Sequence, residues 1–231
     1  MELTLPVRQF HFRNTHRLIP SRFPPVGILD RVSNPDDLDA IFELEGWTND
    51  RITNEMGIVE RLPRSEWVSG TPNASVVMAA FCHPRPEGSR FNDGSLGAWY
   101  AALTLRTAHA EVLHHRQREL AEVGVTNASL LMREYRARFQ ADFHSLLEEK
   151  GEFDRFYDPA SYAASQDLGS GLRGAGSNGI VYRSVRDSGG TCVVCFRPGL
   201  IRDVRQGSHF EYHFSRSGPP LIRRIRDEAA D

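Results

Sequence analysis

The spacing of apolar residues along the chain predicts several helices. The clearest runs from about Thr104 to Glu122, where Ala108, Val112 and Leu113 recur at helical intervals on one face. An earlier helix is predicted to start at Asn34-Pro35, because proline suits the first helical position. A later one is predicted to start at Asp158-Pro159, with Asp158 as its N-cap, and to end in a glycine-rich turn.

Other apolar runs have the length and composition of strands. The strongest pair is 180–184 and 191–196, joined by a turn at Gly189-Gly190. The remaining candidates are 67–70, 75–81, 98–102 and 209–214. Residues 129–149 are predicted as a helical or mixed segment, and 17–26, with three prolines, as extended chain. Strands and helices do not alternate regularly, so we expect an α+β domain rather than a doubly wound parallel sheet.

Composition supports one intracellular globular domain. The chain has 231 residues, of which 40% are hydrophobic and 25% charged, and no internal repeat or long linker divides it. We therefore expect a single domain over 1–231, with its core at about 15–215. No run approaches 18 apolar residues and the N-terminus lacks a signal-peptide pattern, so a cytoplasmic protein is expected. The net charge of −2 gives no support to a polyanionic partner.

The cysteines and histidines do not make a convincing metal site. Cys192 and Cys195 form a C-x-x-C pair, but they lie in a predicted strand, where residues three apart point to opposite faces. They are interpreted as core residues. His109, His114 and His115 crowd the long helix without further ligands, and most of them are interpreted as surface or capping residues. No metal is expected.

Three segments combine turn glycines with residues that can do chemistry. In the loop Gly88–Gly94, Arg90 could approach a ligand phosphate, although an ordinary solvated loop would look the same. Glu111 lies beside the apolar stripe of the long helix, where a carboxylate is costly unless it is functional or paired with an arginine. Ser184, which ends an apolar strand, either binds a ligand or starts a turn. The sequence contains no P-loop, GxSxG elbow or HExxH motif.

The order of these segments resembles the RES domain family. The matching parts are an arginine before an extended stretch (Arg17), a Gly-Ser-Arg-Phe-Asn loop (88–92), a strand tyrosine (Tyr100), a helical glutamate eleven residues later (Glu111) and a strand of the form G-I-V-Y-x-S-x-R (179–186). Ser89 and Phe91 depart from the commoner glycine and tryptophan of the loop. The resemblance covers roughly residues 15–215.

This resemblance implies a fold and a reaction. RES domains are similar to ADP-ribosyltransferases, with a split mixed or antiparallel sheet flanked by helices, and they consume NAD by cleaving the nicotinamide–ribose bond. It implies that Glu111 stabilises the positive charge that develops on the ribose. Tyr100 would stack on nicotinamide, and Arg17 and Arg90 would hold the pyrophosphate or the adjoining ribose.

The resemblance also implies roles for Asn92 and Ser184, a set of possible ADP-ribose acceptors and a partner protein. Asn92 is counted with the NAD-binding residues, and Ser184 would hydrogen-bond the nicotinamide ribose or amide. The ADP-ribose acceptor is left open between water, phosphate and a target protein, so the enzyme is either a transferase or a NAD glycohydrolase or phosphorylase. As a toxin of a toxin–antitoxin pair, the protein would be blocked by an Xre-like helix-turn-helix antitoxin, and a homodimer within that complex is compatible with the resemblance. No membrane or direct nucleic-acid partner is implied.

Three alternatives stay open at this point. The chain could be a nucleotide-binding module without turnover, which an intact Glu111 disfavours. It could be an RNA-cleaving toxin, which the absence of a basic, aromatic-rich surface pattern disfavours. It could also be a structural partner protein whose arginines lie on its surface, and toxicity on expression would exclude that reading.

Overall fold

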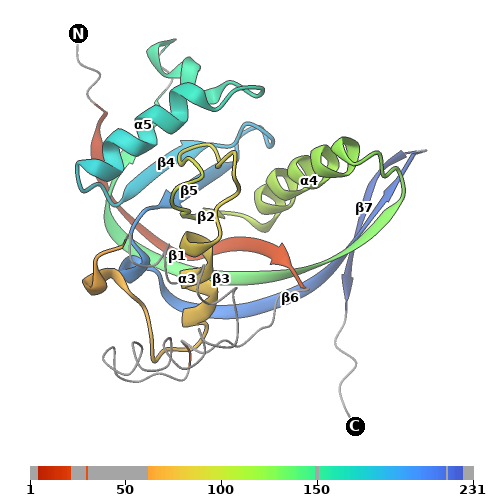
Figure 1. The fold of residues 1–231 in the computed structure, drawn as a ribbon, viewed down its shortest axis with the longest axis horizontal. Helices are drawn as coiled ribbons and strands as arrows, with labels where there is room; N and C mark the ends of the chain where they lie inside the picture. Colours follow the sequence, from red (N-terminus) through yellow and green to blue (C-terminus); the bar gives the residue numbers. More distant parts are fainter. Residues whose placement is uncertain (1–4, 22–29, 31–61, 149–150, 217, 226–231) are drawn as a thin grey trace.

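A seven-stranded mixed sheet forms the centre of the molecule (Figure 1). The computed structural model describes residues 5–21, 30, 62–148, 151–216 and 218–225. The strands are β1 (Val7–Pro20), β2 (Trp99–Ala102), β3 (Ala128–Ser145), β4 (Gly179–Arg183), β5 (Thr191–Cys195), β6 (Arg202–Ser215) and β7 (Gly218–Ile225). Their order is β1-β2-β5-β4-β3-β6-β7, and β1 also pairs with β3.

The sheet is split into two parts. In one part β2, β5 and β4 pair antiparallel along their whole lengths, and in the other β1, β3, β6 and β7 do the same over longer stretches. Only short pairings join the parts: His16 opposite Ala102, and a parallel contact of His144 and Ser145 with Ile180 and Val181. The expected α+β fold with a split, mostly antiparallel sheet is therefore confirmed.

Helices cover both faces of the smaller part of the sheet. The α-helices are α3 (Ala74–Cys82), α4 (Leu105–Glu122) and α5 (Ala163–Gly174), and short 3-10 turns occur at η2 (Arg64–Glu66), η3 (Gly151–Tyr157) and η4 (Pro198–Leu200). Side chains of α3 pack in one hydrophobic cluster, and side chains of α4, α5 and η3 pack in the other. No helix in the described ranges is both long and apolar enough to cross a membrane.

Strand β5 shows how the sheet separates these two cores. Cys192 lies in the cluster with α4, whereas Cys195 lies in the cluster with α3, and both thiols are free and buried. The prediction that these cysteines fill the core from opposite faces is confirmed. The predicted strand pair around Gly189-Gly190 is confirmed as well, as is the short strand at β2.

The predicted helix from about Thr104 to Glu122 is also confirmed. Helix α4 begins directly after Thr104, whose Oγ1 accepts a hydrogen bond from the backbone N–H of Thr107 at 3.2 Å. Such a side-chain bond satisfies one of the N–H groups that the first helical turn leaves without a partner. The cap therefore fixes where the helix starts.

Two strand predictions near the start of the described core are wrong. Residues 75–81 belong to helix α3, and 67–70 form no strand. Helix α3 is buried on nearly all sides, so its apolar run carries no helical periodicity to distinguish it from a central strand. Asp30 helps to start the helix, because its carboxylate accepts hydrogen bonds from the N–H groups of Asn73 and Ser75.

Two further predictions need correction, and a third holds with longer bounds. The described part of 129–149 is not helical, because most of it forms β3, whose long pairings with β1 and β6 override local preference. Helix α5 begins at Ala163 and not at Asp158, whose carboxylate instead accepts from the N–H groups of Ala160 and Ser161 in a preceding turn. The strand at 209–214 is part of the longer β6, followed by β7. The helix predicted at Asn34-Pro35 and the segment 22–26 lie outside the described residues.

Candidate active site

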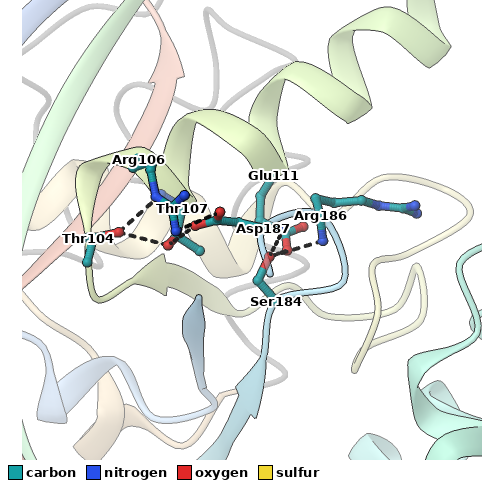
Figure 2. A network of polar contacts seen from close by, with 7 residues as sticks. All are labelled: Thr104, Arg106, Thr107, Glu111, Ser184, Arg186 and Asp187. Carbon is teal, nitrogen blue, oxygen red and sulfur yellow. Dashed lines mark hydrogen bonds and ion pairs between the residues drawn. The ribbon is translucent and has the colours of Figure 1, made fainter. Parts of the chain in front are cut away.

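Glu111 and Ser184 meet where α4 passes the end of β4 (Figure 2). The Ser184 hydroxyl donates to Glu111 Oε1 at 2.6 Å. The same hydroxyl oxygen accepts from the N–H groups of Arg186 at 3.1 Å and Asp187 at 2.9 Å. Ser184 therefore starts the turn, and it also faces Glu111; its role as a ligand-binding residue stays a prediction. Among the described residues, Glu111 Oε1 contacts this serine and, at 4.0 Å, the Cys192 thiol, and Glu111 forms no ion pair with an arginine there.

A second set of contacts fixes the turn after Ser184 to the start of α4. Thr107, which is fully buried, donates from Oγ1 to Asp187 Oδ2 at 2.7 Å, and Arg106 forms an ion pair with Asp187 Oδ1 at 3.0 Å. Thr104 and Thr107 share a hydroxyl–hydroxyl bond of 2.8 Å. Figure 2 shows this series of polar contacts beside the Glu111–Ser184 pair. It holds the two elements that carry Glu111 and Ser184 in a fixed relation.

Sequence reasoning missed Thr107 and Asp187. The two residues are 80 positions apart, and each resembles an ordinary cap or turn residue. Gly190, which closes the same turn, is also involved, because a Cβ on it would lie 2.8 Å from the Thr107 side chain. The only available signal was the capping spacing of Thr104 and Thr107.

Tyr100 links β2 to the predicted phosphate-binding loop. Its hydroxyl donates to Asn92 Oδ1 at 2.8 Å and accepts from the N–H of Phe91 at 2.9 Å. Burial raises the pKa of Tyr100 above its ordinary value, so the hydroxyl stays protonated. The structure thus brings together two predicted site residues, Tyr100 and Asn92, and uses the tyrosine to hold the loop.

Arg17 lies against the same strand. Its Nη1 donates to the carbonyl of Tyr100 at 3.1 Å, and its guanidinium stacks 4.9 Å from the ring centre of Trp99. Burial lowers the pKa of Arg17 to about 10, and within the described part of the chain its Nε has no hydrogen-bond partner. This Nε is therefore an unsatisfied polar atom that is shielded from solvent.

The loop that carries Arg90 is buried rather than solvated. Arg90 is 8% exposed, and its Nη1 donates to the carbonyls of Phe156 and Asp158 at 3.0 and 3.1 Å, while its guanidinium lies 4.6 Å from the ring centre of Tyr162. Gln166 of α5 donates to three loop carbonyls, those of Glu87, Ser89 and Asn92. The interpretation of this segment as an ordinary solvated loop is therefore wrong.

Tyr182 lies between these groups; it is the tyrosine of the 179–186 motif, but it was not among the predicted site residues. It lies on β4 two residues before Ser184, is 5% exposed, and packs edge-on against Phe91 with ring centres 4.8 Å apart. Burial raises the pKa of Tyr182 well above its ordinary value; the charge of Glu111 adds to this and that of Arg90 opposes it. Glu111 and Arg90 thus act electrostatically on the same buried side chain. Side-chain contacts form two groups, Glu111 with Ser184, and Tyr100 with Asn92. Arg17 instead contacts the main-chain carbonyl of Tyr100 and stacks on Trp99, which belongs to the hydrophobic cluster with α3 on the other face of the sheet.

The histidines of α4 differ from expectation. His109 Nδ1 is 2.6 Å from the Tyr212 hydroxyl and its ring packs edge-on against Phe210, so it belongs to the interior. Burial, together with nearby positive charge from Arg85, lowers the pKa of His115 to about 3. Both side chains are half-buried, so neither is a fully exposed surface residue. Across the described ranges, no three His, Cys, Asp or Glu side chains are grouped so as to hold a metal ion.

Comparisons with known proteins identify the family. The uncharacterized protein y4oC of Sinorhizobium fredii is 28% identical over 203 residues, which cover 85% of this chain and 81% of that protein. The crystal structure of the MbcT-MbcA toxin-antitoxin complex of M. tuberculosis contains a chain with a TM-score of 0.40 and 17% identity, which covers 53% of this chain and 73% of that one. The RES domain model matches residues 58–215, which is more than half of the sequence. The chain therefore belongs to the RES domain family.

Proposed function

We propose that this protein is the toxin of a toxin–antitoxin pair and cleaves NAD at the nicotinamide–ribose bond. The observation that carries the proposal is the 2.6 Å hydrogen bond between Ser184 and Glu111, because it joins the two motif residues to which the family resemblance assigns chemistry. NAD as substrate and the toxin role are supported by membership of the RES family. The protein would act as a single domain in the cytoplasm.

The chemistry requires little beyond a well-placed carboxylate. When the ribose C1′–nitrogen bond breaks, nicotinamide leaves as a neutral base with the bonding electrons, and positive charge develops on the ribose. The Glu111 carboxylate stabilises that charge, and Ser184 orients the carboxylate and meets the ribose or the amide. An acceptor oxygen then bonds to C1′ and loses its proton. The cationic pyridinium is already a good leaving group, so this scheme needs no metal.

Binding of the dinucleotide falls to the second group of residues. The main-chain bonds of Arg90 use one of its nitrogens, which leaves other guanidinium donors for the pyrophosphate or the adjoining ribose. Arg17 is assigned to the dinucleotide by the family resemblance; in the structure its Nη1 donates to the Tyr100 carbonyl and its Nε is shielded from solvent. Tyr100 holds Asn92 and the loop through its hydroxyl, and its ring offers a surface for nicotinamide.

The acceptor and the partner follow from the same proposal. ADP-ribose would pass to water, phosphate or a target protein, and an Xre-like antitoxin would block the active site. Incubating the purified protein with NAD and a cell extract, followed by mass spectrometry, tests this. Free ADP-ribose or its 1″-phosphate indicates a NAD-depleting enzyme, and a protein that gains one ADP-ribose unit indicates a transferase. If NAD stays intact in this incubation, the proposal is contradicted and a binding module is favoured.

A further inference from the structure

A cavity of about 940 Å³ lies on the other side of α4 from Glu111. It is bordered by the start of α4 and by β1, β3, β6 and β7, and its lining includes the side chains of Leu105, His16, Glu134, Gln206, Arg136 and Arg224. Its size falls in the range of small-molecule sites. Figure 1 shows α4 between the β4–β5 hairpin and the β6–β7 hairpin. Ser184 directly follows β4, whereas β6 and β7 contribute to the lining of the cavity.

Contacts of α4 support this separation. His109 and Glu111 are two residues apart and therefore point to different sides of the helix. His109 contacts Tyr212 of β6, whereas Glu111 contacts Ser184 beyond the end of β4. Glu134 accepts a hydrogen bond from the N–H of Ser208 in β6, which places the His16–Glu134 pair on the β6 side. The cavity is thus distinct from the candidate active site.

A buried histidine–carboxylate pair forms the floor of the cavity. Glu134, only 4% exposed, accepts at Oε1 from His16 Nδ1 at 2.6 Å and at Oε2 from the N–H of Ser208 at 3.0 Å. The Asn14 amide nitrogen is 3.1 Å from His16 Nε2, so Asn14 and Glu134 hold the two sides of the ring. Burial alone would raise the pKa of Glu134, but its hydrogen bonds bring the pKa below the ordinary value.

The backbone is shaped to admit this carboxylate. A Cβ on Gly207 would lie 2.3 Å from Glu134 Oε2, so the glycine leaves the space that the carboxylate occupies. A buried, ionised carboxylate is expensive to maintain and is a frequent feature of functional sites. Glu134 still has lone pairs beyond those used by His16 and Ser208, and these can accept from ligand hydroxyl groups.

The rim of the cavity carries the opposite charge. Arg136 of β3 and Arg224 of β7 are exposed, and both contribute to the lining together with the amide of Gln206. Two guanidinium groups outweigh the single carboxylate on the floor. Because guanidinium donors match the geometry of phosphate and carboxylate oxygens, the rim suits an anionic group.

We propose that this cavity binds a small polyol that carries a phosphate or carboxylate group. The anionic end binds Arg136 and Arg224 at the rim, and the hydroxyl end donates to Glu134 on the floor. This arrangement keeps the ligand's negative charge away from the buried carboxylate. The site is independent of NAD cleavage and does not require Glu111.

Isothermal titration calorimetry with ribose 5-phosphate and with gluconate tests the proposal and distinguishes the two anionic groups. We expect at least one of these two ligands to bind. If the phosphate is the group recognised, ribose should bind at least tenfold more weakly than ribose 5-phosphate. Arg136→Gln and Arg224→Gln should each weaken binding about tenfold, and Glu134→Gln should weaken it while the thermal melting curve shows a folded protein.

The matched control is Arg223→Gln, because Arg223 neighbours Arg224 on β7, points to the other face and is not part of the cavity lining. It should leave the affinity unchanged, and so should Glu111→Gln. Equal losses in Arg223→Gln and Arg224→Gln would mean non-specific attraction to a basic strand and would overturn the proposal. The proposal would also be overturned if neither ribose 5-phosphate nor gluconate gave a binding heat in the calorimeter. A loss of binding in Glu111→Gln would place the ligand in the other site.

Discussion

At the scale of single residues, the proposed chemistry depends on the charge of Glu111 rather than on its hydrogen bond. Ser184 donates to Glu111 Oε1, and a glutamine at position 111 would keep an acceptor oxygen of the same shape. We expect Glu111→Gln to fold normally and to lower kcat for NAD cleavage roughly 100- to 1000-fold, the range for losing one electrostatic stabiliser of a transition state. NAD affinity should change little.

Rapid-quench measurement of nicotinamide release gives kcat, and calorimetry gives the affinity for NAD. Glu122→Gln is the matched control, because Glu122 is an exposed residue of the same helix that pairs only locally with Arg118. If Glu111→Gln retained wild-type kcat, Glu111 would have no role in the reaction.

The Thr107–Asp187 contact makes a separate prediction about stability. Thr107→Val and Asp187→Asn each break or weaken a hydrogen bond to a charged, buried acceptor, which typically costs about 1.5–3 kcal/mol of unfolding free energy. In a double-mutant cycle measured by urea unfolding, we expect a coupling energy of about 1 kcal/mol. Asp203→Asn, which affects the exposed pair with Arg138, should cost about 0–1 kcal/mol. A coupling near zero would show that the contact does not fasten α4 to the turn.

These residues also show which members of the candidate site can be predicted from the sequence. Glu111 and Ser184 could be selected because each lies in a motif with a fixed order and spacing. Thr107 and Asp187 could not, because their contact arises only when α4 and the turn after β4 are brought together.

At the scale of elements, the sequence predicts a helix or strand well when one of its faces is buried and the other is exposed. Helix α4 has a buried face and an exposed face, so its periodicity is visible. Helix α3 is buried nearly all round and was therefore indistinguishable from a central strand. Strand β3 was misjudged because its pairing partners, β1 and β6, are far away in sequence and supply its stability.

The contact of α5 with the Arg90 loop gives a prediction at this scale. A Cβ on Gly169 would lie 2.0 Å from the carbonyl oxygen of Phe91, whereas Gly171 on the same helix has open space. Gly169→Ala should lower the unfolding free energy by about 1–3 kcal/mol through overpacking, although alanine favours helices. Gly171→Ala should raise it by about 0.5–1 kcal/mol.

Urea unfolding followed by circular dichroism measures both glycine variants. Because the clash moves the loop that holds Arg90 and Asn92, Gly169→Ala should also weaken NAD binding, while Gly171→Ala should not. Equal stability of the two variants would mean that α5 does not press against the loop.

At the scale of the whole molecule, the topology explains why a site forms between distant segments. The two parts of the sheet touch only at short pairings, and α4 lies beside both, with Glu111 toward β4 and His109 toward β6. Local sequence signals predict the separate strands of each part. They do not predict β1–β3 pairing, which joins residues more than 100 positions apart, so the cavity beside His16 had no sequence signal.

The same packing predicts how stability depends on pH. Burial, with the charge of Arg85 nearby, lowers the pKa of His115 to about 3, and burial also lowers the pKa of His109, His114 and His144. The folded state therefore keeps these imidazoles neutral, while the unfolded chain protonates them below about pH 6.5. Since the unfolded state then binds more protons, stability is full above that pH and falls as the pH drops toward 3.

His115→Gln isolates one of these groups. Each such histidine can contribute up to about 1.4 kcal/mol per pH unit to the slope, so the variant should lose unfolding free energy less steeply between pH 6.5 and 4. Urea unfolding at four pH values in this window measures the slope, and His11→Gln, at an exposed position of β1, is the control that should leave it unchanged. A slope in His115→Gln equal to that of the wild type would mean that His115 is protonated in the folded protein, and α4 would then have to accommodate a charge where the structure packs a neutral ring.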